Sequence, residues 1–235
     1  MGPAAGTQDI PVLTIDGPSG SGKGTVSRAA ARELGWALLD SGALYRLVAL
    51  GARRSGIDLA DAQGLARLAR TMDIYFGSGP SGAEIVHLGG RDVTFDIRTE
   101  SAGSDASKVA ALPAVRQALL ERQRRFARPP GLVADGRDMG TVVFPNARVK
   151  IFLTASALER AERRYKQLKE KGVAATLAAL STEIAERDRR DMERAASPLV
   201  ASEDAVVLDS TGMSIDAVVG RILGIVRERI GSGHS

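Results

Sequence analysis

The sequence has 235 residues, 44% of them hydrophobic and 26% charged, and it carries a formal net charge of +4 at pH 7. This length suits one α/β domain with a sizeable core, and no apolar run approaches the roughly 18 residues that a membrane-spanning helix needs. The absence of cysteine excludes disulfides and thiolate metal sites, and with only 4% aromatic residues the positive charge favours small phosphorylated ligands over single-stranded nucleic acid.

The first predicted element is a strand that runs into a glycine-rich loop and a helix. Val12–Ile15 is a short apolar run, residues 17–22 read GPSGSG and can only form a tight loop, and apolar residues then recur with helical spacing up to Leu34. The N–H groups of such a loop, the helix N-terminus and the ammonium of Lys23 together attract phosphate. We expect Lys23 to be exposed in this loop.

The loop departs from the usual phosphate-loop pattern at one position. The pattern G-x-x-x-x-G-K-[ST] is met from Gly17 to Lys23, but Gly24 stands where a Ser or Thr would hold Mg²⁺, and the hydroxyl follows on Thr25. This variant resembles the loop of nucleoside monophosphate kinases more than that of GTPases or motor ATPases. The strand before it and the helix after it argue against a chance lysine in a glycine-rich turn.

A second buried strand is predicted at Trp36–Leu39, and Asp40 is a suitable cap for a helix that follows it to Gly51. Ligands of parallel sheets bind at the carboxyl ends of the strands, so polar residues at the start of this helix should lie beside the glycine-rich loop. These residues are Ser41, Tyr45 and Arg46. For Tyr45, a place on the helix surface is equally compatible with the sequence.

The next two segments differ in character. Residues 53–71 predict one or two short helices broken near Gly56 and Gly64. Residues 72–98 contain three short alternating stretches, MDIYF, EIVHL and DVTF, separated by glycine-rich turns, which predicts a small antiparallel sheet inserted in the α/β chain. His87 lies in the middle strand, but with two histidines in the whole chain a zinc site is not expected.

The middle of the chain predicts a basic helix and a strand that ends in a carboxylate. Residues 101–109 are small and polar, and we assign no element to them. A helix is predicted at Pro113–Phe126, with four arginines on a solvated face: Arg122, Arg124, Arg125 and Arg128. The apolar strand at residues 132–134 ends in Asp135, which resembles the position where phosphate-loop enzymes orient hydrated Mg²⁺.

After a strand at residues 149–153, two helices are predicted at Ala157–Lys171 and Thr182–Ala195. On the first helix, helical spacing puts three arginines on one face: Arg160, Arg163 and Arg164. On the second helix, the residues on one stripe are Arg187, Asp191 and Arg194. Such stripes are typical of a salt-bridged surface, but two such helices beside a phosphate site would also form a closing lid. A strand at residues 206–208 and a helix at 215–230 complete the chain.

Four strings make a family resemblance specific: IDGPSGSGKGT, LLDSGALYR, ADGRDMGTVVFPNA and ERDRRDMERAASPLV. Over residues 10–230 the chain resembles the bacterial cytidylate kinases, a branch of the nucleoside monophosphate kinases. The resemblance implies a single α/β domain, a P-loop kinase core with a central parallel sheet flanked by helices. The core would comprise residues 10–71, 99–156 and 198–230. The β insertion of the monophosphate-binding region would comprise residues 72–98, and a short helical lid would comprise residues 157–197.

The resemblance also implies roles for individual residues. ATP would be bound by the loop residues Gly17, Pro18, Ser19, Gly20, Ser21, Gly22, Lys23, Gly24 and Thr25. The acceptor nucleotide would be bound by Ser41, Tyr45, Arg46, Ser107, Arg116, Arg137, Asp138, Arg187, Asp191 and Arg194.

Within the acceptor set, the cytosine edge would be read by Ser107, Arg116 and Asp138. The acceptor phosphate would be held by Arg46, Arg137 and Arg187, and the sugar would be met by Asp191 with Tyr45. The catalytic cations would be Lys23, Arg137, Arg163 and Arg187, with Arg163 and Arg164 of the lid on the transferring phosphoryl group. No direct protein ligand is implied for Mg²⁺, which would be held through water near Thr25 and Asp135.

The implied reaction is phosphoryl transfer from ATP to CMP or dCMP. It needs no general base, because the nucleophile is a phosphate oxygen that is largely ionised at neutral pH. Two alternatives remain. One is a kinase for another small acceptor, such as UMP, AMP or an alcohol with Asp40 or Asp135 as base, and the other is a nucleic-acid-stimulated ATPase. We expect a cytoplasmic monomer that binds neither nucleic acid nor membrane, because the N-terminal sequence MGPAAGTQDI lacks the features of a secretion signal.

Overall fold

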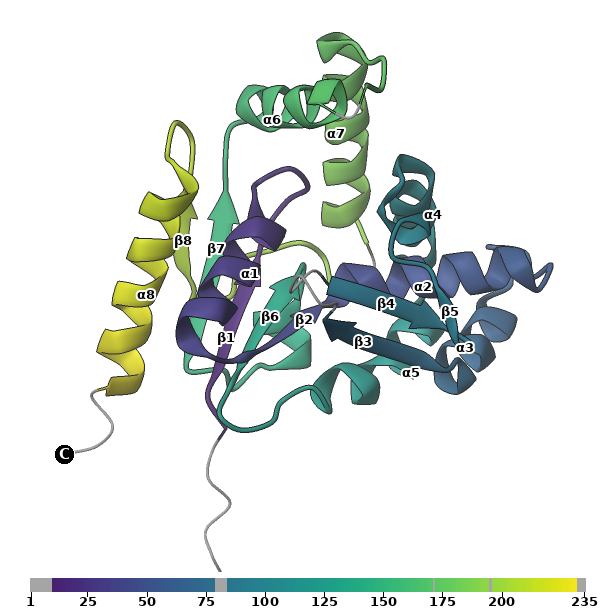
Figure 1. Ribbon diagram of the computed structural model, residues 1–235, viewed down its shortest axis with the longest axis horizontal. Helices are drawn as coiled ribbons and strands as arrows, with labels where there is room; N and C mark the ends of the chain where they lie inside the picture. The colour runs from purple at the N-terminus through teal and green to yellow at the C-terminus, as the bar shows by residue number, and fades with distance from the viewer. Residues whose placement is uncertain (1–9, 79–83, 171, 195, 232–235) are drawn as a thin grey trace, which may run out of the picture.

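The computed structural model describes residues 10–78, 84–170, 172–194 and 196–231. A five-stranded sheet in the order β2-β6-β1-β7-β8 forms its centre, and all its pairings are parallel (Figure 1). The strands are β1 (Val12–Asp16), β2 (Ala37–Asp40), β6 (Leu132–Gly136), β7 (Val149–Thr154) and β8 (Val206–Asp209). Because both faces of the sheet are covered, the middle strands are apolar runs rather than alternating ones.

Side chains of alternate residues along β1 and β6 enter two separate hydrophobic clusters. Leu13 and Ile15 pack against α1 (Lys23–Leu34) and α8 (Ile215–Gly231) on one face of the sheet. Val12 and Leu132 lie in the larger cluster on the other face. The helices of that cluster are α2 (Ser41–Arg54), α3 (Ala62–Thr71), α4 (Glu100–Ala110) and α5 (Pro113–Arg124). This two-sided burial is what the period of two along a strand requires.

A second sheet of three antiparallel strands in the order β3-β4-β5 confirms the predicted insertion. Its strands are β3 (Ile74–Ser78), β4 (Glu84–Leu88) and β5 (Arg91–Asp92). The prediction of a third strand through residue 95 was wrong. The Thr94 hydroxyl accepts the N–H of Val86 and donates to Asp92, so a side-chain turn replaces the ladder. A 3-10 turn (Asp96–Arg98) then leads into α4.

One helix was not predicted, and two helix predictions need correction. Residues 101–109 form most of α4, because Thr99 caps it and Val109 lies in the core. Gly64 does not break α3 but lies in its first turn, where its N–H donates to Asp61. The second predicted lid helix, α7 (Leu177–Met192), begins five residues earlier than Thr182, because Thr176 caps it at Ala179 N. The predicted helix ends at residues 171 and 195 lie outside the described residues.

The helices α6 (Ala157–Glu170) and α7 pack against each other and lie above the carboxyl end of β7, with α4 beside α7 (Figure 1). A π-helical turn at Met139–Val143 follows β6 and was not predicted. The loops at the carboxyl ends of the parallel strands therefore face the α6–α7 hairpin and α4. This is the edge at which open α/β sheets bind their ligands.

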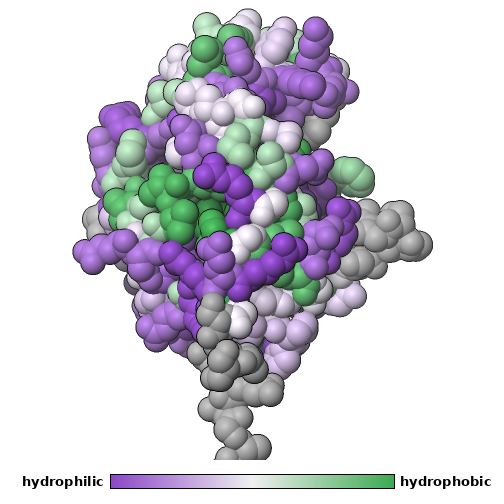
Figure 2. Space-filling view, turned by 90° about the vertical axis from the view of Figure 1, so that its left-hand side faces the viewer, coloured by the Kyte–Doolittle hydropathy of each residue, from purple (hydrophilic) through white to green (hydrophobic). Residues whose placement is uncertain are grey.

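The side of the molecule that carries α8 and β8 is mixed in character. Figure 2 shows apolar residues near the middle of this face and polar residues around them. Exposed apolar side chains include Val207 of β8 and Ile215 at the start of α8. Within the described ranges, no helix is both long and apolar enough to cross a bilayer.

Candidate active site

A cavity of about 600 Å³ lies between the glycine-rich loop and helices α2, α4, α6 and α7. Every acceptor-side residue predicted from the sequence lines it: Ser41, Tyr45, Arg46, Ser107, Arg116, Arg137, Asp138, Arg187, Asp191 and Arg194. The loop contributes Ser19, Gly20, Gly22, Lys23, Gly24 and Thr25, whereas Gly17, Pro18 and Ser21 do not line the cavity. The fold thus brings the two predicted residue sets to one space.

The glycine-rich loop is shaped by backbone that only glycine tolerates easily. Gly17 has a φ of +147°, and a Cβ added there would overlap with the carbonyl oxygen of Leu153 in β7. Gly22, with φ +91°, is the residue before the first turn of α1. The loop therefore presses against β7 and delivers the unpaired N–H groups of a helix N-terminus to the cavity.

Lys23 is buried, so the expectation of an exposed lysine was wrong. Its ammonium folds back over the loop and donates to the carbonyl oxygen of Pro18 at 2.7 Å. Burial lowers the pKa of Lys23 to about 7, and the nearby Arg137 charge acts in the same direction. The side chain is therefore held at the cavity wall in an environment that disfavours its charge until an anion arrives.

Two carboxylates end neighbouring strands below the loop. Asp135 ends β6 near Gly24: its Oδ2 lies 3.4 Å from the place where a Cβ of Gly24 would stand. Asp16 ends β1 and accepts the N–H groups of Met139 and Gly140, each at 2.8 Å. Burial raises the pKa of Asp135 to about 7 and that of Asp16 to about 6.

The donor set around Gly24 fits a hydrated Mg²⁺ rather than a directly caged ion. Gly24 leaves open the space that Asp135 approaches, and the hydroxyl of the neighbouring Thr25 is exposed at the cavity. Both supply oxygen, the ligand that Mg²⁺ prefers, and Mg²⁺ usually keeps several waters. In the part of the chain that the structure describes, no group of three or more His, Cys, Asp or Glu residues could hold a metal ion.

Three predicted acceptor-side cations converge from β6, α2 and α7. Arg137 forms an ion pair with Asp191 at 2.8 Å, and although burial opposes it, the Asp191 carboxylate raises the pKa of Arg137. Arg46 donates to the carbonyl oxygen of Ile97 at 2.7 Å. Arg187 is different, because its Nε is buried without a partner, and burial together with the Arg137 charge lowers its pKa to about 10.

The residues predicted to read the base form one wall of the cavity. Arg116 and Asp138 form a buried ion pair, and the Arg116 guanidinium lies 5.7 Å from the centre of the Tyr45 ring. Tyr45 is only 7% exposed, so the alternative of a surface aromatic was wrong. The hydroxyl of Ser107 is buried without a hydrogen-bond partner. A buried polar atom of this kind at a cavity wall fits a ligand that supplies the missing bond.

The lid arginines do not share one role. Arg163 donates to the carbonyl oxygens of Ser21 and Ser210 and pairs with Glu159, so its guanidinium is occupied by protein partners. Arg164 lines the cavity and forms an ion pair with Glu100 of α4. Both arginines line the cavity, but the Arg163 guanidinium contacts the glycine-rich loop whereas that of Arg164 contacts α4.

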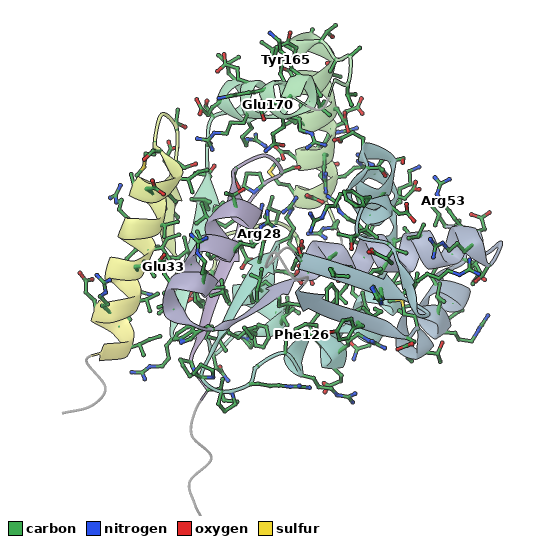
Figure 3. All side chains as sticks on the ribbon, viewed as in Figure 1. Arg28, Glu33, Arg53, Phe126, Tyr165 and Glu170 are labelled. Carbon is green, nitrogen blue, oxygen red and sulfur yellow. The ribbon has the colours of Figure 1, made fainter. Side chains whose placement is uncertain are left out.

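Sequence reasoning missed contributions from other residues. The basic helix α5 is not simply solvated, since Arg122 donates to the carbonyl oxygen of Met72 and Arg124 to that of Val143, although Arg125 and Arg128 are exposed as expected. Arg28, which extends from α1 in Figure 3, also lines the cavity. For Asp16, a signal was present in the sequence: an acidic residue that ends the first buried strand directly before the loop.

Comparisons with known proteins agree with this site. The family model for cytidylate kinase matches residues 13–228. A cytidylate kinase of Stutzerimonas stutzeri (strain A1501) is 58% identical over 94% of this chain and 96% of its own length. One of Pseudomonas aeruginosa (strain LESB58) is 60% identical over 91% of this chain and 94% of its own. The resemblance found in the sequence is confirmed: the chain belongs to the cytidylate kinase family.

Proposed function

We propose that this site transfers the terminal phosphoryl group of ATP to CMP or dCMP. The observation that carries the proposal is that two buried groups on the acceptor side of the cavity, the Nε of Arg187 and the hydroxyl of Ser107, have no hydrogen-bond partner, as is also true of the Nη2 of Arg194. Arg187 forms no ion pair among the described residues, and Ser107 lines the same cavity as the Arg116–Asp138 pair. A nucleotide with a phosphate and a polar base edge would satisfy both. Membership of the family, whose two compared relatives are named cytidylate kinases, supports the same reaction.

The donor phosphates would lie against the N–H groups of the glycine-rich loop and the Lys23 ammonium. Because burial lowers the pKa of Lys23, an arriving phosphate anion restores the charged form. The charge is then already positioned where negative charge develops during transfer, so little reorganisation is needed.

The acceptor phosphate would be held by Arg46, Arg137 and Arg187, with Asp191 orienting Arg137 and meeting the sugar. At neutral pH a phosphate monoester is largely a dianion, because its second pKa is about 6, so it attacks without a base. Asp135 is consequently not needed as a proton acceptor. The part of this chain in the reaction is to align the two phosphates and to neutralise charge.

Mg²⁺ would be held through water near Thr25 and Asp135. Bound there, it would supply positive charge to offset the negative charge of the donor phosphates. The Asp135 carboxylate, whose pKa burial raises, would return to its ionised form beside this cation.

We further propose the division of labour that the resemblance implied. Residues 157–197 would act as a lid that excludes water from the two nucleotides, and residues 72–98 would belong to the monophosphate-binding region, within a single domain. We also propose that the chain acts as a cytoplasmic monomer and needs no nucleic acid partner.

The test is ADP production from ATP across a panel of nucleoside monophosphates. We expect CMP and dCMP to be phosphorylated much faster than AMP, GMP or UMP. UMP has a carbonyl where cytosine has an amino donor, so with Asp138 as acceptor it would lose a hydrogen bond, a penalty of about 1–3 kcal/mol. AMP as the best acceptor would contradict the proposal.

A further inference from the structure

Arg160 of α6 is a buried arginine with no role in the reaction described above, and its contacts join three parts of the chain. Its Nε donates to the carbonyl oxygen of Ala155 after β7 at 3.1 Å, and its Nη1 donates to that of Ser19 in the glycine-rich loop at 3.0 Å. Its Nη2 forms an ion pair with Asp188 of α7 at 2.7 Å. With only 6% of the residue exposed, the planar guanidinium holds these partners in one fixed arrangement.

The backbone of α6 touches the loop at the same place. Gly20, which follows Ser19, has a φ of +77°, and a Cβ added there would lie 3.1 Å from the Cβ of Arg160. Helix α6 therefore rests directly on the loop, without an intervening side chain from it. Because protein interiors are closely packed, a displacement of the loop at this contact also displaces α6.

Asp188 continues this connection to the acceptor side of the cavity. It is adjacent to Arg187 and about one helical turn before Asp191, whose carboxylate pairs with Arg137 at 2.8 Å. All three residues belong to α7, so a shift of Asp188 moves Arg187 and Asp191 with it. The polar chain from Ser19 through Arg160 to Asp188 thus ends on the helix that presents the acceptor-side residues.

We propose that Arg160 is a positioning residue that couples the binding of the two nucleotides. A donor bound to the loop fixes Ser19 and Gly20, Arg160 transmits this order to Asp188, and α7 is held where Arg187 and Asp191 meet the acceptor. Since coupling between two binding sites is reciprocal, the acceptor tightens donor binding by the same factor. The proposal rests on the proposed function, because it assumes that ATP and CMP are the two ligands.

Calorimetric titration of the full chain tests the proposal. CMP is titrated with and without a saturating non-hydrolysable ATP analogue and Mg²⁺, and the ratio of the two dissociation constants measures the coupling. We expect the analogue to tighten CMP binding at least about fivefold in the unmodified chain. In Asp188→Asn, which keeps both carbonyl contacts of Arg160 but removes the charge of its partner, the ratio should fall below about twofold, while the analogue alone binds within about twofold of normal.

Two further variants complete the design. Arg160→Lys keeps the positive charge but lacks the planar guanidinium with its several N–H donors, so it should also lose the coupling between CMP and the ATP analogue. Lys166→Ala removes a cation from the exposed side of the same helix and should keep the full ratio. If thermal melts show that Arg160→Lys does not fold, Asp188→Asn decides alone.

An unchanged ratio in Asp188→Asn would overturn the proposal, and so would an unmodified chain in which the analogue leaves CMP affinity unaltered. Both results are compatible with a working cytidylate kinase. A chain that binds no CMP at all would instead contradict the proposed function. A purely structural role for Arg160 would lower the melting temperature in its variants without changing the ratio.

Discussion

Replacing Arg187 by alanine should separate function from stability. Burial and the Arg137 charge lower the pKa of Arg187 from the usual arginine range to about 10, so the ligand-free protein disfavours its charge. At about 1.36 kcal/mol per pKa unit, the charge costs the ligand-free protein about 3 kcal/mol. For a base with a lowered folded pKa, stability rises as the pH increases above about 10, and at pH 7 the whole cost is present.

Arg187→Ala should therefore keep or raise the melting temperature at pH 7. The gain is smaller than the full charge penalty, because the variant also loses the packing of the arginine side chain. Each kcal/mol corresponds to about 2–4 °C for a chain of this size. The same change should lower kcat/KM for CMP about 100- to 1,000-fold, because a cation on the acceptor phosphate is lost. The assays are a thermal melt and steady-state kinetics at saturating ATP.

Arg190→Ala is the matched control for this prediction. Arg190 lies on the same helix but is exposed, and its one hydrogen bond goes to the carbonyl oxygen of Glu186 at 3.4 Å. We expect changes within about 0.5 kcal/mol in stability and near-normal kinetics. A melting temperature several degrees lower in Arg187→Ala, together with kinetics like those of Arg190→Ala, would show that Arg187 is a structural cation and would refute the reasoning.

Three other predictions concern the glycine-rich loop. Lys23→Met should abolish turnover without lowering the melting temperature, because the buried ammonium is destabilising in the empty protein. Because the pKa of Lys23 is about 7, its side chain should take up a proton when ATP binds at pH 8. Calorimetry in buffers of different ionisation enthalpy detects this uptake, and binding heats that do not depend on the buffer would contradict the prediction. Gly17→Ala should lower the free energy of unfolding by more than about 3 kcal/mol, because the new Cβ would overlap with the Leu153 carbonyl oxygen. The control is Gly35→Ala, which also has a positive φ but no atom within 4 Å of the new Cβ, and which should lower it by about 1 kcal/mol. Equal losses of unfolding free energy in chemical denaturation would exclude the steric explanation.

Local patterns predicted the elements that carry a strong short-range signal. The apolar run, glycine loop and helical spacing around Lys23 identified β1 and α1, and the alternating stretches identified the β insertion around His87. The family and its reaction class were predicted from four strings, of which the one around Arg137 and Asp138 is the most distinctive. Parallel pairing then places these strings at one edge of the sheet.

Other features depend on tertiary contacts that no local pattern records. Helix α4 was missed because its small and polar residues give little hydrophobic periodicity, yet Ala106 and Val109 are buried there. The burial of Lys23 depends on how the loop folds, because its ammonium turns back onto the carbonyl oxygen of Pro18 five residues earlier. The role of Arg163 on the phosphoryl group stays a prediction from the resemblance, and arginine spacing does not show that the carbonyl oxygens of Ser21 and Ser210 accept from its guanidinium.

The position of β1 in the middle of the sheet has a consequence for synthesis of the chain. β1 pairs with β6 through Val12 and Leu132 and with β7 through Leu13 and Val149, so both neighbours leave the ribosome long after β1 does. Until then, an apolar strand has no partner, and such distant pairings make folding slow and expose the chain to aggregation. A nascent chain that ends before β7 should therefore fail to assemble its nucleotide loop, and this protein is expected to become active only after most of its length has been translated.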